Sequence, residues 1–125
     1  MPKKILVIDD EELITRTFCK LLEKEGLEVL VAKRNEDAIV FAEEEDFDLI
    51  ISDIRMPGQN GIQTIRQIEK LLVLQNRKKP PVIFITGFTD KKLEDEAKRL
   101  GCTAFLYKPF ESEDLLNAIN RSLKK

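Results

Sequence analysis

The stretch 48–61 reads Asp-Leu-Ile-Ile-Ser-Asp-Ile-Arg-Met-Pro-Gly-Gln-Asn-Gly and combines the pattern of a buried strand with that of a loop. Its unbroken apolar run, 49–51, is typical of a strand covered on both faces, as in a parallel sheet. Pro57 and Gly58 favour a loop and cannot extend that strand. Asp53 is therefore expected at the carboxyl end of a buried strand, the edge where ligands bind in open α/β sheets.

A carboxylate at this position needs a partner. Burying an unpaired carboxylate costs roughly several kcal/mol, so Asp53 requires solvent, a cation or a cationic side chain. The alternative is a structural role, in which Asp53 caps the next helix. Asn60 is better placed for that role, because it directly precedes the helical apolar pattern that includes Ile62 and Ile65.

Length and composition limit the class of protein. With 125 residues, 42% hydrophobic and 35% charged, the chain suits one globular domain, 1–125, with one core. A net charge of −2 predicts no general attraction to nucleic acid. The apolar run 5–8 is too short for a signal peptide, and no stretch is long enough to span a bilayer. We therefore expect a cytoplasmic protein.

The residue types present restrict the chemistry. The sequence contains no histidine, which excludes Ser-His-Asp and Cys-His catalysis and histidine metal sites. Cys19 and Cys102 lie far apart without metal-ligand spacing, and we expect reduced thiols in or near the core. Any chemistry must depend on carboxylates, lysine, hydroxyl groups, backbone amides and a hard cation.

Strand and helix patterns alternate five times along the chain. The expected strands are 5–8, 29–32, 49–51, 82–85 and 104–107, each followed by apolar residues at helical spacing. Gly26 and Gly101 are expected to end helices, and Asn35, Asn60 and Asp90 to cap them. The alternation predicts parallel strands with right-handed crossovers and helices on both faces. The sheet should be open, since a closed barrel needs eight such units.

Polar residues follow four of the five expected strands. They are Asp9 and Asp10 after the first, Asp53 after the third, Thr86 after the fourth and Lys108 after the fifth. Because parallel strands end at one edge, these side chains should converge. Three carboxylates and one lysine leave excess negative charge, and like charges about 4 Å apart repel by roughly 1 kcal/mol even in water. A hard dication such as Mg²⁺, held by two carboxylates and waters, relieves that repulsion.

Such a site suits phosphoryl transfer. A metal-bound carboxylate beside a lysine and a hydroxyl can position a phosphoryl group and neutralise its charge, and an aspartate can itself accept that group. Taken singly, an Asp-Asp pair after a strand is often loop solvation, and a Lys-Pro step is often a turn. The hypothesis depends on their combination at strand ends in order.

Four motifs occur together over essentially the whole chain. They are Asp9-Asp10, Asp53 with Met56-Pro57-Gly58, Thr86-Gly87 and Lys108-Pro109-Phe110. In this combination the chain resembles the receiver domain of bacterial two-component response regulators. The resemblance implies a flavodoxin-like open sheet with strand order 2-1-3-4-5, and a site at the ends of the first, third, fourth and fifth strands.

The resemblance also implies a role for each acidic residue and for one carbonyl. Asp53 would be the phosphoacceptor. Asp10 and Asp53 would bind Mg²⁺ through their side chains, together with the main-chain carbonyl of Arg55. Asp9 would act mainly through a metal-bound water.

The phosphoryl group would have its own set of partners, again by resemblance. Lys108 would pair with the phosphoryl oxygens, and Thr86 would close on them by a hydrogen bond. The backbone amides of Ile54 and Gly87 would help to hold the group. The Lys108–Pro109 peptide bond is expected to be cis.

A conformational switch is implied as well. Phosphorylation adds charge and acceptor oxygens, drawing Thr86 inward so that an aromatic residue on the fifth strand follows. Phe105, three residues before Lys108, matches that position, although a plain core aromatic is the alternative, and Tyr107 does not match. The face of the fourth helix, fifth strand and fifth helix would carry the output. Phe88 would shield the phosphoryl group from hydrolysis or, alternatively, contact a partner.

As a receiver, the domain would take its phosphoryl group from a phosphohistidine on a sensor histidine kinase or phosphotransfer protein. It would signal to an effector domain or target protein, with a homodimer formed on phosphorylation as a further outcome, and would contact neither nucleic acid nor membrane directly. It would catalyse its own phosphorylation and slow dephosphorylation without substrate turnover. A stand-alone receiver and a piece of a longer regulator or hybrid kinase both remain open.

Three rival classes fit less well. A phosphatase of the haloacid dehalogenase type expects Asp-x-Asp after its first strand, where this chain has Asp-Asp-Glu-Glu. A flavin-binding module needs a phosphate-cradling loop there, and four acidic residues repel a phosphate. A degenerate receiver used only for binding conflicts with the intact set of five site residues.

Overall fold

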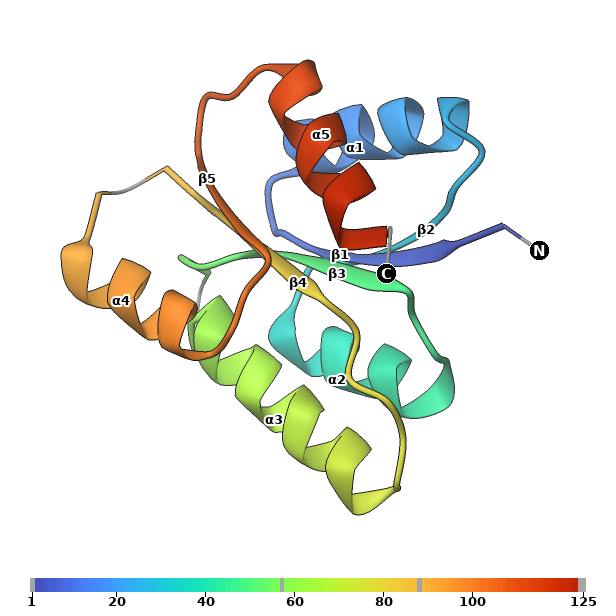
Figure 1. Cartoon of the computed structure of the whole chain (residues 1–125), viewed down its shortest axis with the longest axis vertical. Coiled ribbons are helices and arrows are strands. Elements are labelled where there is room, and N and C mark those ends of the chain that lie inside the picture. Colours follow the sequence, from blue (N-terminus) through green and yellow to red (C-terminus); the bar gives the residue numbers. More distant parts are fainter. Residues whose placement is uncertain (1, 57, 88, 124–125) are drawn as a thin grey trace.

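One sheet of five parallel strands, in the order β2-β1-β3-β4-β5, organises the computed structural model within its described residues, 2–56, 58–87 and 89–123 (Figure 1). The strands are β1 (Lys4–Ile8), β2 (Glu28–Ala32), β3 (Leu49–Asp53), β4 (Val82–Thr86) and β5 (Ala104–Tyr107). The helices are α1 (Glu12–Lys24), α2 (Asn35–Glu44), α3 (Gly61–Leu74), α4 (Lys91–Arg99) and α5 (Ser112–Leu123). The predicted flavodoxin-like topology is confirmed.

Helices cover both faces of the sheet, with α1 and α5 on one side and α2, α3 and α4 on the other (Figure 1). The three central strands are buried along almost their whole length, and their side chains alternate between two apolar clusters. Leu6 and Ile50 pack with α2 and α3, whereas Val7 and Ile51 pack with α1 and α5. Apolar runs of this kind are therefore buried on both faces. None of the described helices is both long enough and apolar enough to cross a membrane.

Most of the expected helix boundaries are confirmed. Asn60 caps α3 in a reciprocal capping box, in which the Gln63 N–H donates to Asn60 Oδ1 and the Asn60 N–H donates to Gln63 Oε1, both at 2.9 Å. The Asp90 side chain accepts from the first amides of α4. Gly26 and Gly101 follow helix ends at φ +80° and +89°, a conformation that favours glycine.

The expectation that Asn35 caps α2 was wrong. Asn35 is the first residue of that helix and is buried. Its Nδ2 donates to the Gln59 carbonyl at 2.6 Å, and its Oδ1 accepts from Thr64 Oγ1 at 2.7 Å. A buried amide needs partners for both its donor and its acceptor. Asn35 satisfies this need by tying α2 to the loop and first turn of α3.

The start of α3 lies directly against the end of β3. The Gly61 N–H donates to the Ile54 carbonyl at 2.8 Å. A Cβ added at Gly61 would lie 2.1 Å from the Asp53 carbonyl oxygen and 2.7 Å from Ser52 Oγ. Only glycine permits this approach, which fixes the backbone behind Asp53.

We predict that Gly61→Ala lowers the free energy of unfolding by about 1–3 kcal/mol, the usual effect of overpacking a close contact. The added methyl group forces either the end of β3 or the start of α3 to move. Gly87→Ala is the matched control, because no other described heavy atom lies within 4 Å of a Cβ there; it should change stability by less than about 0.5 kcal/mol. Urea unfolding measures both, and equal stabilities for the two variants would contradict this account.

Candidate functional site

The residues predicted at the strand ends meet at one edge of the sheet. Asp9 follows β1 directly, Asp53 and Thr86 are the last residues of β3 and β4, and Lys108 follows β5. The register of the parallel ladder places Asp53 beside Ile85. Parallel pairing therefore brings to one place side chains that are separated by up to 99 positions in the sequence.

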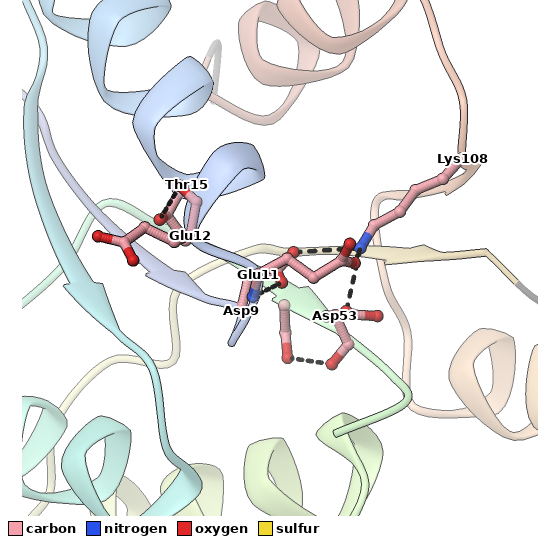
Figure 2. A network of polar contacts seen from close by, with 7 residues as sticks. Asp9, Glu11, Glu12, Thr15, Asp53 and Lys108 are labelled. Atoms are coloured by element: carbon pink, nitrogen blue, oxygen red, sulfur yellow. Dashed lines mark hydrogen bonds and ion pairs between the residues drawn. The ribbon is translucent and has the colours of Figure 1, made fainter. Parts of the chain in front are cut away.

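Lys108 is the centre of this group (Figure 2). Its Nζ lies 3.1 Å from Asp53 Oδ2, 3.3 Å from Asp9 Oδ2 and 2.6 Å from Glu11 Oε1. Burial alone would lower the pKa of Lys108, but these carboxylates outweigh it and raise that pKa above its usual value. The lysine therefore remains charged and holds the ends of β1 and β3 together.

Asp9 is the most deeply buried of the acidic side chains, at 0% exposure. Its Oδ1 accepts from the Glu11 N–H at 2.9 Å, and its Oδ2 accepts from Lys108. Burial, with a smaller contribution from the charge of Asp53, raises the pKa of Asp9 to about 6. In the protein without metal, its ionised form is thus held at an energetic disadvantage.

Asp53 has a similar but better compensated environment. Burial raises its pKa, while Lys108 and a backbone hydrogen bond from Arg55 oppose the rise. Its side chain is 5% exposed. The charged lysine beside it favours the ionised form of Asp53, which is the form that a nucleophile requires.

The acidic side chains form a set that suits a hard cation. Asp9, Asp10 and Asp53 each offer one carboxylate oxygen, and these oxygens lie within 4.8 Å of one another. Ligands on one Mg²⁺ ion lie at most about 4 Å apart, since each bond is about 2.1 Å long, so small side-chain rotations suffice. Asp10 is exposed at the rim, whereas Asp9 already has hydrogen-bond partners for both oxygens. The donor set therefore fits Mg²⁺.

The residues expected around the phosphoryl group differ in burial and in the partners that they already have. Thr86 is buried at the end of β4, and Gly87 is exposed beside it. The Ile54 N–H donates to the Ile85 carbonyl at 3.0 Å, so this amide already serves the sheet. Phe88, and with it the shielding hypothesis, lies outside the described residues.

The segment around Lys108 confirms one expectation and places the predicted switch aromatic. The Lys108–Pro109 bond is cis, as expected. Phe105 is half-buried and packs against the apolar cluster under α4. Its ring centroid lies 5.2 Å from that of Tyr107, the next residue on the same face of β5.

Sequence reasoning missed Glu11. It used the run Asp-Asp-Glu-Glu only as a source of negative charge, yet Glu11 is the closest of the three carboxylates described at Lys108. Glu12, the next residue, instead pairs with Arg16 and Lys33. The position of Glu11 at the junction of β1 and α1 was the only available signal, and it does not distinguish the two glutamates.

We predict that Asp9→Asn raises the melting temperature at pH 7 by a few degrees when divalent metal is absent. The pKa of Asp9, about 6 in the folded protein and ordinarily 3.8, means that folding favours the protonated form. The free energy of unfolding should therefore fall as the pH rises from about 4 to 6, and the variant should lose this dependence.

Thermal melts of both proteins at pH 4 and pH 7 provide the measurement. The advantage of Asp9→Asn should shrink at pH 4, where the wild-type carboxyl group is largely protonated. Asp10→Asn removes the same charge from an exposed side chain and should give a smaller increase. A lower melting temperature at pH 7, or a gain that does not depend on pH, would contradict the prediction.

Comparisons with known proteins agree with this geometry. The family model described as "Response regulator receiver domain" matches residues 5–120. Protein PilH of Pseudomonas aeruginosa is 35% identical over 96% of this chain and 97% of its own length. Transcriptional regulatory protein PdtaR of Mycobacterium tuberculosis is 30% identical over all of this chain, which spans 58% of that protein.

Solved structures give the same result. The chemotaxis protein CheY4 of Vibrio cholerae superimposes with a TM-score of 0.87 at 31% identity, covering 98% of this chain and 100% of that one. The family match extends over nearly the whole chain, and the topology and the acidic strand ends agree with it. This chain therefore belongs to the response regulator receiver domain family.

Proposed function

We propose that this domain accepts one phosphoryl group on Asp53 and changes the surface of α4, β5 and α5 in response. The proposal rests mainly on the contact of 3.1 Å between Lys108 Nζ and Asp53 Oδ2. This contact lies within a group of acidic oxygens that fits Mg²⁺. A receiver domain is a signalling domain and turns over no substrate. The modification itself is therefore the product.

The donor would be a phosphohistidine on a sensor kinase or phosphotransfer protein, because this chain has no histidine. A carboxylate oxygen of Asp53 attacks the phosphorus, an O–P bond forms and the P–N bond breaks. The imidazole nitrogen keeps the electron pair of that bond and takes a proton from water. The later return to the free carboxylate is hydrolysis of the acyl phosphate.

Each residue of the site contributes to positioning or to charge balance. Lys108 donates to Asp53 before transfer and to a phosphoryl oxygen afterwards. Asp10, Asp53 and the Arg55 carbonyl would hold Mg²⁺, with Asp9 contributing through a bound water. When bound, Mg²⁺ would supply positive charge that balances the phosphoryl oxygens.

The remaining phosphoryl contacts come from the end of β4 and from the residue after Asp53. The Thr86 hydroxyl and the Gly87 N–H would donate to phosphoryl oxygens. The Ile54 N–H would have to share its hydrogen with the Ile85 carbonyl, to which it now donates at 3.0 Å. We therefore expect the Ile54 N–H to bind the phosphoryl group more weakly than the Thr86 hydroxyl and the Gly87 N–H do.

A line of contacts supports a switch that runs from Thr86 to α4. Thr86 lies opposite Tyr107 in the β4–β5 register, and Phe105 lies opposite Phe84 on the same face. The Tyr107 hydroxyl donates to Glu94 of α4. An inward movement of Thr86, followed by Phe105, would thus be transmitted to α4 through Tyr107.

We predict that acetyl phosphate and Mg²⁺ add a single phosphoryl group to the wild-type protein, as measured by intact-protein mass spectrometry. Asp53→Asn should abolish the modification, and removal of Mg²⁺ with EDTA should prevent it. Asp48→Asn is the matched control, since Asp48 precedes β3 at the opposite edge of the sheet and accepts from the Lys4 N–H. Modification that persists in Asp53→Asn would refute the assignment.

We also predict that Tyr107→Phe uncouples α4 from phosphorylation without preventing it. The substitution removes only the hydroxyl that donates to Glu94. Chemical-shift changes of the amides in 91–99 on phosphorylation should fall to about half or less, because the variant loses the hydrogen bond to Glu94 and keeps the apolar packing of Phe105 under α4, while those of Thr86 and Phe105 persist. Two-dimensional NMR before and after acetyl phosphate tests this, and an unchanged response in α4 would rule out the link.

A further inference from the structure

Glu11 has a contact with Lys108 that the proposed chemistry does not use. A lysine ammonium has three N–H donors, and in the described part of the chain Lys108 faces three carboxylates, from Asp9, Glu11 and Asp53 (Figure 2). The contact with Glu11, at 2.6 Å, is the shortest. A phosphoryl oxygen that binds Lys108 must therefore displace one of these acceptors.

Within the described residues, the Glu11 side chain has no evident structural role apart from its contact with Lys108. Glu11 is the N-cap residue of α1, but its side chain makes no capping hydrogen bond to the described helix. Its backbone N–H donates to Asp9 Oδ1, an interaction that does not depend on the side chain. The carboxylate instead extends to Lys108, which is 97 positions away in the sequence.

Burial decides which of the three acceptors can leave. Until the O–P bond forms, Asp9 and Asp53 are both carboxylates, 0% and 5% exposed, and losing the lysine would leave a charge stranded away from water. Glu11 is 57% exposed and can rotate into solvent at little cost. Asp9 and Asp53 also suffice to keep Lys108 in place when Glu11 leaves.

We propose that Glu11 competes with the phosphoryl group for Lys108 and so restrains the phosphorylation of Asp53. This inference rests on the proposed function and adds a residue that acts through Lys108. Before transfer, Glu11 occupies one N–H of the lysine and adds a negative charge that opposes an anionic donor. When the donor approaches, one of its phosphoryl oxygens takes that N–H while Asp53 is still a carboxylate, and Glu11 turns outward.

The chain provides a matched control for this proposal in Glu12. It is the next residue, carries the same charge and is similarly exposed, at 63%. It pairs with Arg16 at 3.7 Å and with Lys33 at 3.6 Å. Glu11→Gln and Glu12→Gln therefore make the same change in net charge, and only the first alters a contact with Lys108.

The experiment measures initial rates of phosphorylation by acetyl phosphate at saturating Mg²⁺ for the wild type and both variants. Glu11→Gln should react about three- to tenfold faster, the range for a charged hydrogen bond that is partly exposed. Glu12→Gln should stay within about twofold of the wild type. At about 1 M salt, where screening extends to about 3 Å, the advantage of Glu11→Gln should shrink.

A second readout tests the contact without metal or donor. In ¹⁵N NMR of the metal-free protein, the Lys108 ammonium signal should shift in Glu11→Gln and not in Glu12→Gln. An unshifted signal in Glu11→Gln, equal acceleration in both variants, or slower phosphorylation of Glu11→Gln would each overturn the proposal. A wild-type protein that takes up no phosphoryl group at all, while the NMR signals behave as expected, would instead count against the proposed function.

Discussion

The contacts of the Lys108 ammonium with carboxylates from two other strand ends are the interaction on which the site depends. They join β1, β3 and β5 at an edge where the backbone alone would leave several anions in a small, largely buried space. Because Lys108 remains charged, it opposes the rise that burial causes in the pKa of Asp53. The same contacts that compensate the buried charge of Asp53 hold this candidate phosphoacceptor in place.

The fold makes one side of this site rigid and leaves the other adjustable. Behind Asp53, the close approach of Gly61 and the capping box of Asn60 lock the start of α3 against β3. On the opposite side, Glu11 and Asp10 lie at the exposed junction of β1 and α1. This asymmetry suits the proposed function, in which Asp53 must stay in place while a cation and a phosphodonor enter.

The sequence predicted the sheet and the residues at its edge because both follow from local signals. Buried apolar runs identify parallel strands, and the residues after them must share an edge whatever the loops do. The role of Asn35 was not predictable, because its partners Gln59 and Thr64 are set by how α2 packs on α3. The contact of Glu11 was not predictable for a similar reason, since the rotamer of this exposed side chain depends on a lysine 97 positions away.

Charge balance accounts for how the proposed phosphorylation would change the hydrogen bonds of Lys108. Asp9, Asp10, Glu11 and Asp53 together carry four negative charges, against one positive charge on Lys108; a dication brings the sum close to neutral. In the proposed function, the incoming phosphoryl group brings further negative oxygens to the site while Asp53 is still a carboxylate, so the ammonium must serve an additional acceptor. The acceptor that yields most easily is the exposed Glu11. Under this proposal, phosphorylation redistributes the three N–H donors of Lys108 among more oxygens. Thr86 on β4 and Tyr107 on β5 lie beside Lys108, where they can follow that change.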